Sequence, residues 1–221
     1  METYGQAVER MLGRPVRVSR IAASSVPDAE RAVAADDPSR ALLGQADVII
    51  VQVGYNNALP DPETGIGCGG SLSAGIPAWI SSTRPDCLAA GVSTYGEIYA
   101  AILAELKRLR EGEPTVFVVT DTINGNLDPA DPEGLLGVVA PEERDAVREW
   151  AVAAYERWNA MLAEQADIAG FVLVDLYHAF NGVDGTRPSG ALSVDGAHPS
   201  QAGNDLIANL LAEVDLSALA G

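Results

Sequence analysis

The chain has 221 residues, of which 48% are hydrophobic, and it carries a formal net charge of −17 at pH 7. A negative charge of this size argues against nucleic-acid binding and against an anionic membrane surface, because both partners would be repelled. The sequence has no run of about 18 apolar residues, the length that a membrane-spanning helix needs, so we expect no integral membrane segment.

The N-terminal part contains two predicted helices and two predicted strands. Residues 4–12 place apolar side chains at helical spacing, and residues 27–35 open with Pro-Asp, which favours a first helical turn. Residues 15–22 alternate apolar and basic side chains, which predicts a short strand near a sheet edge. The β-branched run at 46–54 is typical of a strand buried on both faces of a parallel sheet.

The rest of the chain continues this alternation of strands and helices. After a loop-like stretch at 58–92, Thr94 is expected to cap a helix that ends near residue 110. The remaining predicted elements are strands at 114–121 and 171–177 and helices at 141–166 and 199–212. Strands alternating with helices imply crossovers between parallel strands, so we predict one α/β domain over residues 1–221, folded as a three-layer α/β/α sandwich.

Both cysteines, Cys68 and Cys87, lie in the Gly-, Pro- and Ser-rich stretch that is predicted to be a loop. A long loop without secondary structure of its own is stabilised most by a covalent bridge, which favours a disulfide between them. A disulfide in turn indicates an oxidising, secreted or extracytoplasmic location. The alternative is two unpaired thiols in the cytoplasm.

Chemistry in a fold of this kind is expected beyond the carboxyl ends of the strands. Three segments are predicted to arrive there: 21–25, 53–57 and 195–200. In the second segment, Gly54 allows close backbone approach, and the side-chain amide of Asn56 is a donor suited to a developing oxyanion.

The third segment carries Asp195 and His198, spaced as D-x-x-H. His198 is a candidate general base, and Asp195 would fix its tautomer and stabilise its protonated form. Alternatively, the two side chains are metal ligands, although a third ligand is not obvious and the other histidine in the sequence is His178. The sequence has neither a phosphate-binding P-loop nor a G-x-S-x-G nucleophile elbow, and no cofactor is expected.

Three segments, taken in order, resemble the SGNH or GDSL-type serine hydrolases. "DVIIVQVGYNNAL" is similar to the family's strand ending in a G-x-N-D block, and "SVDGAHPSQAGNDLIANLL" closely resembles its terminal D-G-x-H-P block. "RIAASSVPDAE" falls where the family has its second block. The resemblance covers the chain from residue 1 to about 212, and it implies a mainly parallel, flavodoxin-like sheet and a serine-type hydrolysis of esters.

The resemblance also assigns roles to residues of this chain. It implies that Asp195 and His198 are the catalytic acid and base, and that Asn56 donates to the oxyanion. The second-block glycine, whose N–H helps to form the oxyanion hole, is replaced by Ser24 or Ser25, so the turn must avoid positive φ.

The fourth position of the G-x-N-D block is Asn57 instead of Asp. We expect this departure to matter little, because Asn56 bears the donor.

The nucleophile of the family is the serine of a G-D-S block at the end of the first strand. The opening "ETYGQAVERML" resembles the segment that follows this serine, so we expect the chain to begin just beyond the nucleophile and to lack the first strand. Thr3, Ser24 and Ser25 are weaker candidates for a replacement, since each suits a cap or turn role better. We therefore expect an N-terminally truncated hydrolase that is inactive or weak by itself.

These observations predict hydrolysis of a small-molecule carboxylic ester, by an enzyme of the esterase, lipase or carbohydrate acyl esterase kind. The apolar stretch 69–80, with Trp79, is a candidate lining for an acyl pocket or else packs over the sheet. Two alternatives stay open: a catalytically dead module that binds an acyl or sugar ligand, and a metal-dependent hydrolase that uses Asp195 and His198. The oligomeric state is left open.

Overall fold

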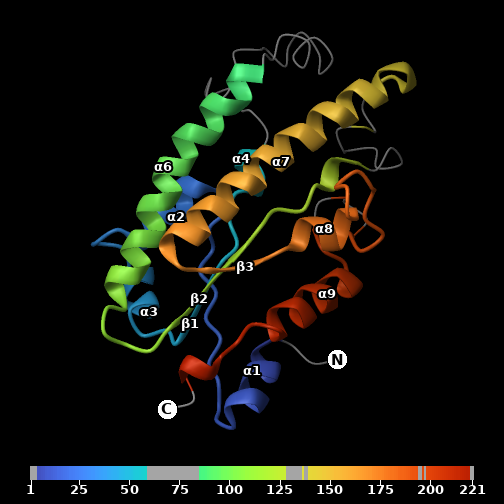
Figure 1. Cartoon of the computed structure of the whole chain (residues 1–221). Coiled ribbons are helices and arrows are strands. Elements are labelled where there is room, and N and C mark those ends of the chain that lie inside the picture. Colours follow the sequence, from blue (N-terminus) through green and yellow to red (C-terminus); the bar gives the residue numbers. More distant parts are fainter. Residues whose placement is uncertain are drawn as a thin grey trace.

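The computed structural model describes residues 4–58, 85–127, 136, 139–193, 196 and 198–219; within these ranges, the side chains of 55–56 and 85–91 are not described. A parallel sheet with the strand order β1-β2-β3 lies at the centre (Figure 1). Its strands are β1 (Val48–Val51), β2 (Val116–Thr120) and β3 (Val172–Val174). In register, Ile50 lies opposite Val118, and Val119 lies opposite Leu173.

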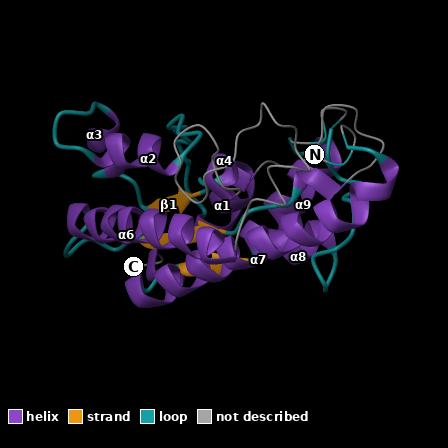
Figure 2. Ribbon diagram, turned by 90° about the horizontal axis from the view of Figure 1, so that it is seen from above, coloured by secondary structure: helices purple, strands orange, loops and turns teal. Residues whose placement is uncertain are grey.

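Helices cover both faces of the sheet, which gives the predicted three layers (Figures 1 and 2). One face packs against α2 (Val26–Val33), α6 (Pro85–Leu109) and α7 (Arg144–Ala169). The other face packs against α1 (Tyr4–Leu12), α8 (Leu176–Asn181) and α9 (Gln201–Ala212). Every residue of β2 is buried, as expected for a strand with apolar layers on both sides.

Short elements complete the described chain. The helices α3 (Ser39–Leu43) and α4 (Tyr55–Ala58) flank β1, and the 3₁₀ turns are Gly125–Leu127, Pro141–Glu143 and Ser217–Leu219. The long helix α7 ends where Gly170 adopts a left-handed conformation, with a φ of 67°, which suits glycine because it has no Cβ. In the part of the chain that the structure describes, no helix is long and apolar enough to cross a bilayer.

The strand predicted at 15–22 is wrong. These residues have no regular secondary structure, and residues 17–20 are exposed. Alternating side chains produce a strand only when a neighbouring strand satisfies the backbone N–H and C=O groups, and the sheet that the structure describes pairs β1 with β2 and β2 with β3. The alternation of Val and Arg therefore did not determine the structure of this segment.

The loop predicted at 58–92 is also wrong at its C-terminal end. Helix α6 already begins at Pro85, so Thr94 lies inside the helix and is not its cap. Proline suits the first helical position, and Ala-rich sequence follows it, so the helix extends further toward the N-terminus than Thr94 suggested. Cys87 thus lies in the first turn of α6, not in a loop.

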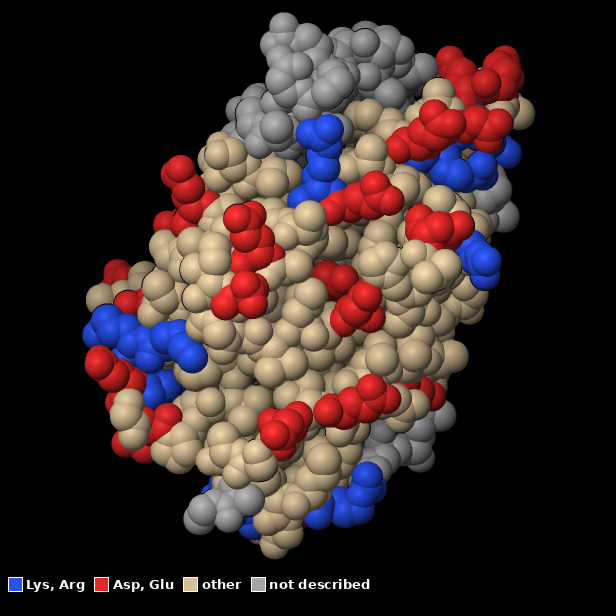
Figure 3. All heavy atoms as spheres, viewed as in Figure 1, with Lys and Arg blue, Asp and Glu red and all other residues tan. Residues whose placement is uncertain are grey.

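Acidic side chains are distributed across the face formed by α6 and α7 (Figure 3). Some of them pair with arginine: Glu105 accepts from both Arg40 and Arg108, and Asp145 pairs with Arg148. Such partly exposed pairs contribute little to stability individually, roughly 0–1 kcal/mol each.

Candidate active site

The three strands are parallel, so their carboxyl ends lie along one edge of the sheet. Helix α4 follows β1 at this edge, Asp121 follows β2, and Asp175 with α8 follows β3. This is the edge at which ligands bind in open α/β folds, and it contains the predicted Gly54–Asn56 turn.

Gly54 begins the turn after β1 and has a φ of 115°, which only glycine adopts readily. A Cβ at this position would lie 2.4 Å from Cζ2 of the buried Trp158. Trp158 also donates from Nε1 to Oγ1 of Thr122, at 3.2 Å, so one indole contacts the turns after both β1 and β2. The backbone of Asn56 lies in α4, but its side chain is outside the described atoms, so its donor role stays a prediction.

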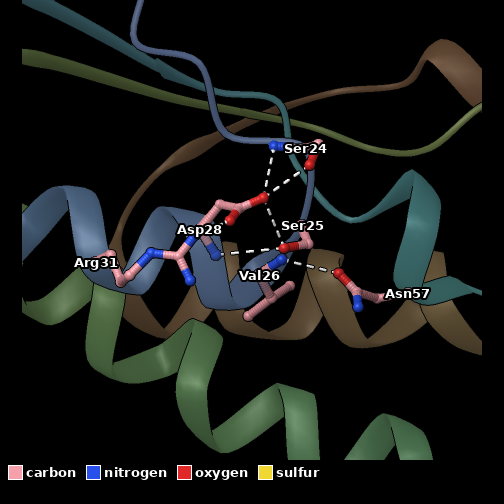
Figure 4. Close-up of polar contacts among 6 residues, drawn as sticks. All are labelled: Ser24, Ser25, Val26, Asp28, Arg31 and Asn57. Carbon is pink, nitrogen blue, oxygen red and sulfur yellow. Dashed lines mark hydrogen bonds and ion pairs between the residues drawn. The ribbon is translucent and has the colours of Figure 1, made fainter. Parts of the chain in front are cut away.

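The Ser24–Ser25 turn leads into α2 (Figure 4). Ser25 caps the helix, accepting from the N–H of Asp28 at 3.3 Å, and its φ of −145° is extended, so the turn avoids the positive φ that would require glycine. Both serine hydroxyls donate to Oδ2 of Asp28, at 2.7 Å from Ser24 and 2.9 Å from Ser25. The hydroxyl bonds from Ser24 and Ser25 lower the pKa of Asp28 to about 2.

These bonds bear on the roles predicted for the two serines. Both hydroxyls donate to a carboxylate of low pKa, which holds them in a capping arrangement, and such a carboxylate is a weak base for activating a nucleophile. The backbone N–H of Ser24 also donates to Asp28, at 3.1 Å. Ser25 is therefore the better candidate for the backbone donor of an oxyanion hole.

Asn57 joins the two turns, a role that we did not expect from the sequence. Its side-chain Oδ1 accepts from the backbone N–H of Val26 at 2.8 Å (Figure 4). The backbone N–H of Asn57 donates to the carbonyl of Gly54, also at 2.8 Å. The bond links the first residue of α2 to α4, 31 positions further along the chain. Asn and Asp both carry an oxygen that can accept here, which explains why either residue suits the position.

The His198 segment leads into α9 through a short antiparallel bridge between Leu192 and Pro199. The N–H of Ser193 donates to the carbonyl of His198 at 2.7 Å, and the hydroxyl of Ser200 caps α9. Pro199 precedes this cap and so lies outside the helix that was predicted to begin with it. The side chain of His198 is exposed.

Asp195 lies outside the described residues, so its pairing with His198 stays a prediction. Thr3, Cys68 and the 69–80 stretch with Trp79 are outside the description too, as is the side chain of Cys87. The predicted disulfide, and the export that it implies, therefore stay predictions. Among the described residues, no three His, Cys, Asp or Glu side chains form a group that could hold a metal ion.

A polar group that the sequence analysis missed lies between β2 and α8. Asp121 is 6% exposed and accepts from the N–H groups of Leu176 and Tyr177, at 2.6 and 2.8 Å. Burial is the main cause that raises the pKa of Asp121, and the negative charge of Asp175 adds to it, whereas the hydrogen bond from the Tyr177 N–H lowers the pKa; together these effects bring it to about 7. Asp175 in turn lies 2.7 Å from Nδ1 of His178. The only sequence signal was a second D-x-x-H spacing, at 175–178.

Comparison with known proteins gives one partial likeness. Over 121 residues the chain is 32% identical to the tRNA modification GTPase MnmE of Beijerinckia indica subsp. indica. The match covers 50% of this chain but only 27% of that protein, and the 221 residues contain no P-loop. No solved structure matches the chain.

A family model, by contrast, matches nearly the whole chain. Residues 2–206 match the GDSL-like Lipase/Acylhydrolase family, and the parallel α/β sheet with helices on both faces agrees with this match. The chain belongs to the GDSL-like Lipase/Acylhydrolase family.

Proposed function

We propose that the site hydrolyses carboxylic esters of small molecules by a serine mechanism. His198 is the general base and later the general acid, and Asp195 orients it. The amide of Asn56 and the backbone N–H of Ser25 stabilise the oxyanion of the tetrahedral intermediate.

The observation that carries this proposal is the hydrogen bond from Val26 N–H to Asn57. It joins the turn that contains Asn56 to the turn that contains Ser25, although these turns are far apart in the sequence. An oxyanion hole needs two donors that are fixed before the reaction begins, because donors that must reorganise lose most of their effect. The contact of Gly54 with Trp158 and the capping bonds of Ser25 fix the same two turns.

We further propose that the nucleophile is the serine of a G-D-S block, which none of the 221 residues forms. Ser24 and Ser25 are held by Asp28 and do not replace it. The 221-residue chain is then weakly active at most, because the base and the oxyanion donors alone supply only a small part of the rate enhancement.

The test compares this chain with a version extended before Met1 by a strand that ends in G-D-S. We expect the extended chain, but not the 221-residue chain, to react with a fluorophosphonate probe and to hydrolyse p-nitrophenyl butyrate. In the extended chain, His198→Ala should lower kcat by at least about 10³-fold. Glu213→Gln, at the far end of α9, is the control and should leave kcat unchanged.

Three outcomes would contradict the proposal. A loss below about tenfold in the His198 variant would exclude His198 as the base. Binding of esters without any labelling of the extended chain would favour a module that has lost catalysis. Activity that disappears with a chelator would favour a metal-dependent hydrolase.

A further inference from the structure

The Asp175–His178 pair lies at the same edge of the sheet but belongs to neither turn of the proposed oxyanion hole. Nδ1 of His178 lies 2.7 Å from Oδ2 of Asp175, a distance typical of a charge-assisted hydrogen bond. The side chains are 48% and 52% exposed, so solvent reaches both of them.

Contacts on the buried side of the pair hold it in place. Oδ1 of Asp175 accepts from the backbone N–H of His178 at 2.9 Å and so caps α8. The ring of Tyr177 packs edge-on against the imidazole, with the ring centres 5.1 Å apart. Below them, the buried Asp121 accepts two N–H groups from the start of α8, which ties the helix to the end of β2.

This arrangement determines which nitrogen of His178 is reactive. A carboxylate can only accept, so the proton of the neutral ring lies on Nδ1 and the lone pair lies on Nε2. Asp175 also stabilises the positive charge that the ring acquires when Nε2 forms a bond. A histidine held in this way has the features of a nucleophile and needs no serine beside it.

We propose that Asp175 and His178 form a second, serine-independent site, at which Nε2 of His178 attacks activated aryl esters. The Nε2 lone pair forms a bond to the ester carbonyl carbon. The bond between this carbon and the aryloxy oxygen then breaks, and its electron pair leaves with that oxygen as a phenolate. The acylated ring is a cation beside Asp175. Water then adds to the acyl carbon and the C–Nε2 bond breaks, which releases the carboxylate and two protons and restores the neutral imidazole.

The sequence makes this proposal simple to test, because the chain contains only two histidines. In a His198→Gln background, His178 is the only histidine left, and the 221 residues contain no G-D-S serine. Any histidine-dependent hydrolysis of p-nitrophenyl acetate by this single-histidine chain therefore reports on His178 alone. Failure of the serine mechanism would not affect the result.

We expect the single-histidine chain to hydrolyse p-nitrophenyl acetate about tenfold faster than free imidazole does per ring. His178→Gln in this background should abolish that excess. Asp175→Asn should remove most of it while the fold is kept, because asparagine caps a helix as well as aspartate does. Asp184→Asn, which removes an exposed carboxylate from the turn after α8, is the control and should change nothing.

A second readout separates positioning from simple folding effects. The Nδ1 proton should give a downfield ¹H NMR signal that disappears in Asp175→Asn while the circular dichroism spectrum is unchanged. The proposal is overturned if the single-histidine chain is no faster than imidazole, or if His178→Gln retains more than about a third of the excess rate. Equal rates with and without Asp175 would overturn the role of the carboxylate.

Discussion

Two features of position 54 require glycine: a φ of 115°, and the indole of Trp158, which occupies the place of a Cβ. Gly112 has a similar φ of 82° but has open space where a Cβ would be. Substitution of each glycine by alanine therefore distinguishes the destabilisation caused by backbone strain from the destabilisation caused by steric overlap with Trp158.

We predict that Gly112→Ala lowers the free energy of unfolding by about 1 kcal/mol, through backbone strain alone. Gly54→Ala should lower it by roughly 2–5 kcal/mol, because displacement of Trp158 adds an overpacking effect. Urea denaturation of both variants measures the difference. Equal losses would show that Trp158 moves aside freely and does not fix the turn.

Asp121 is the buried acid for which the pH dependence of stability can be predicted. Its pKa is raised from 3.8 to about 7 in the folded chain, mainly by burial. A raised pKa means that the folded state holds the proton more tightly than the unfolded state does. The contribution of Asp121 to stability is therefore fully present below about pH 3.8 and is lost as the pH rises through about 7.

We predict that Asp121→Asn removes this loss, because an amide oxygen still accepts from Leu176 and Tyr177 but never ionises. Relative to the original chain, the variant should become more stable between pH 5 and about pH 8. Urea denaturation of the variant and of the original chain at both pH values measures their free energies of unfolding. Asp184→Asn is the control, since hydrogen bonds from Thr186 lower the pKa of Asp184 and its contribution changes only at acidic pH. If the free energies of unfolding of the Asp121 variant and the original chain differ by the same amount at both pH values, the raised pKa is contradicted.

The helices and strands that the sequence predicted well are those whose apolar pattern is satisfied by the core. Both ends of α1 and the C-terminal end of α9 agree with prediction, and β1 and β2 lie within the predicted strands, because each has an apolar layer to pack against. The segment 15–22 has the same kind of pattern but no partner strand among the described residues. The short helix α8 was missed because its first turn depends on Asp121, which is 55 positions away from Leu176. A long-range bond of this kind leaves no local signal.

At the candidate site, the long-range bond of Asn57 likewise could not be predicted from the sequence. The sequence indicated which turns carry the donors, but not which bond joins them. We predict that Asn57→Ala lowers the free energy of unfolding by roughly 1–3 kcal/mol, because the N–H of Val26 loses its acceptor. In the extended, serine-containing chain it should also lower kcat more than it raises KM, since oxyanion donors act in the transition state.

Asn57→Asp is the matched variant, because its carboxylate can accept the same bond. It should recover most of the stability and of kcat. If Asn57→Ala destabilises the chain but leaves kcat unchanged, the bond to Val26 holds α2 in place without positioning a catalytic donor.

Taken as one chain, the protein combines a parallel sheet, whose strands end along one edge, with a strongly negative net charge. The proposed mechanism requires that the tail that carries His198 and the turns that carry Asn56 and Ser25 meet around one reacting carbon. The backbone of the turns at Gly54 and Ser25 and the start of α9 are described, and we predict that they converge there.

A crystal structure of the extended chain, inhibited at its G-D-S serine by a fluorophosphonate, measures this convergence directly. We predict that the phosphonyl oxygen lies about 3 Å from both Nδ2 of Asn56 and the backbone nitrogen of Ser25, with the His198 ring within hydrogen-bond reach of the serine oxygen. A phosphonyl oxygen that contacts neither donor, or a His198 ring at the opposite end of the strands, would contradict the account.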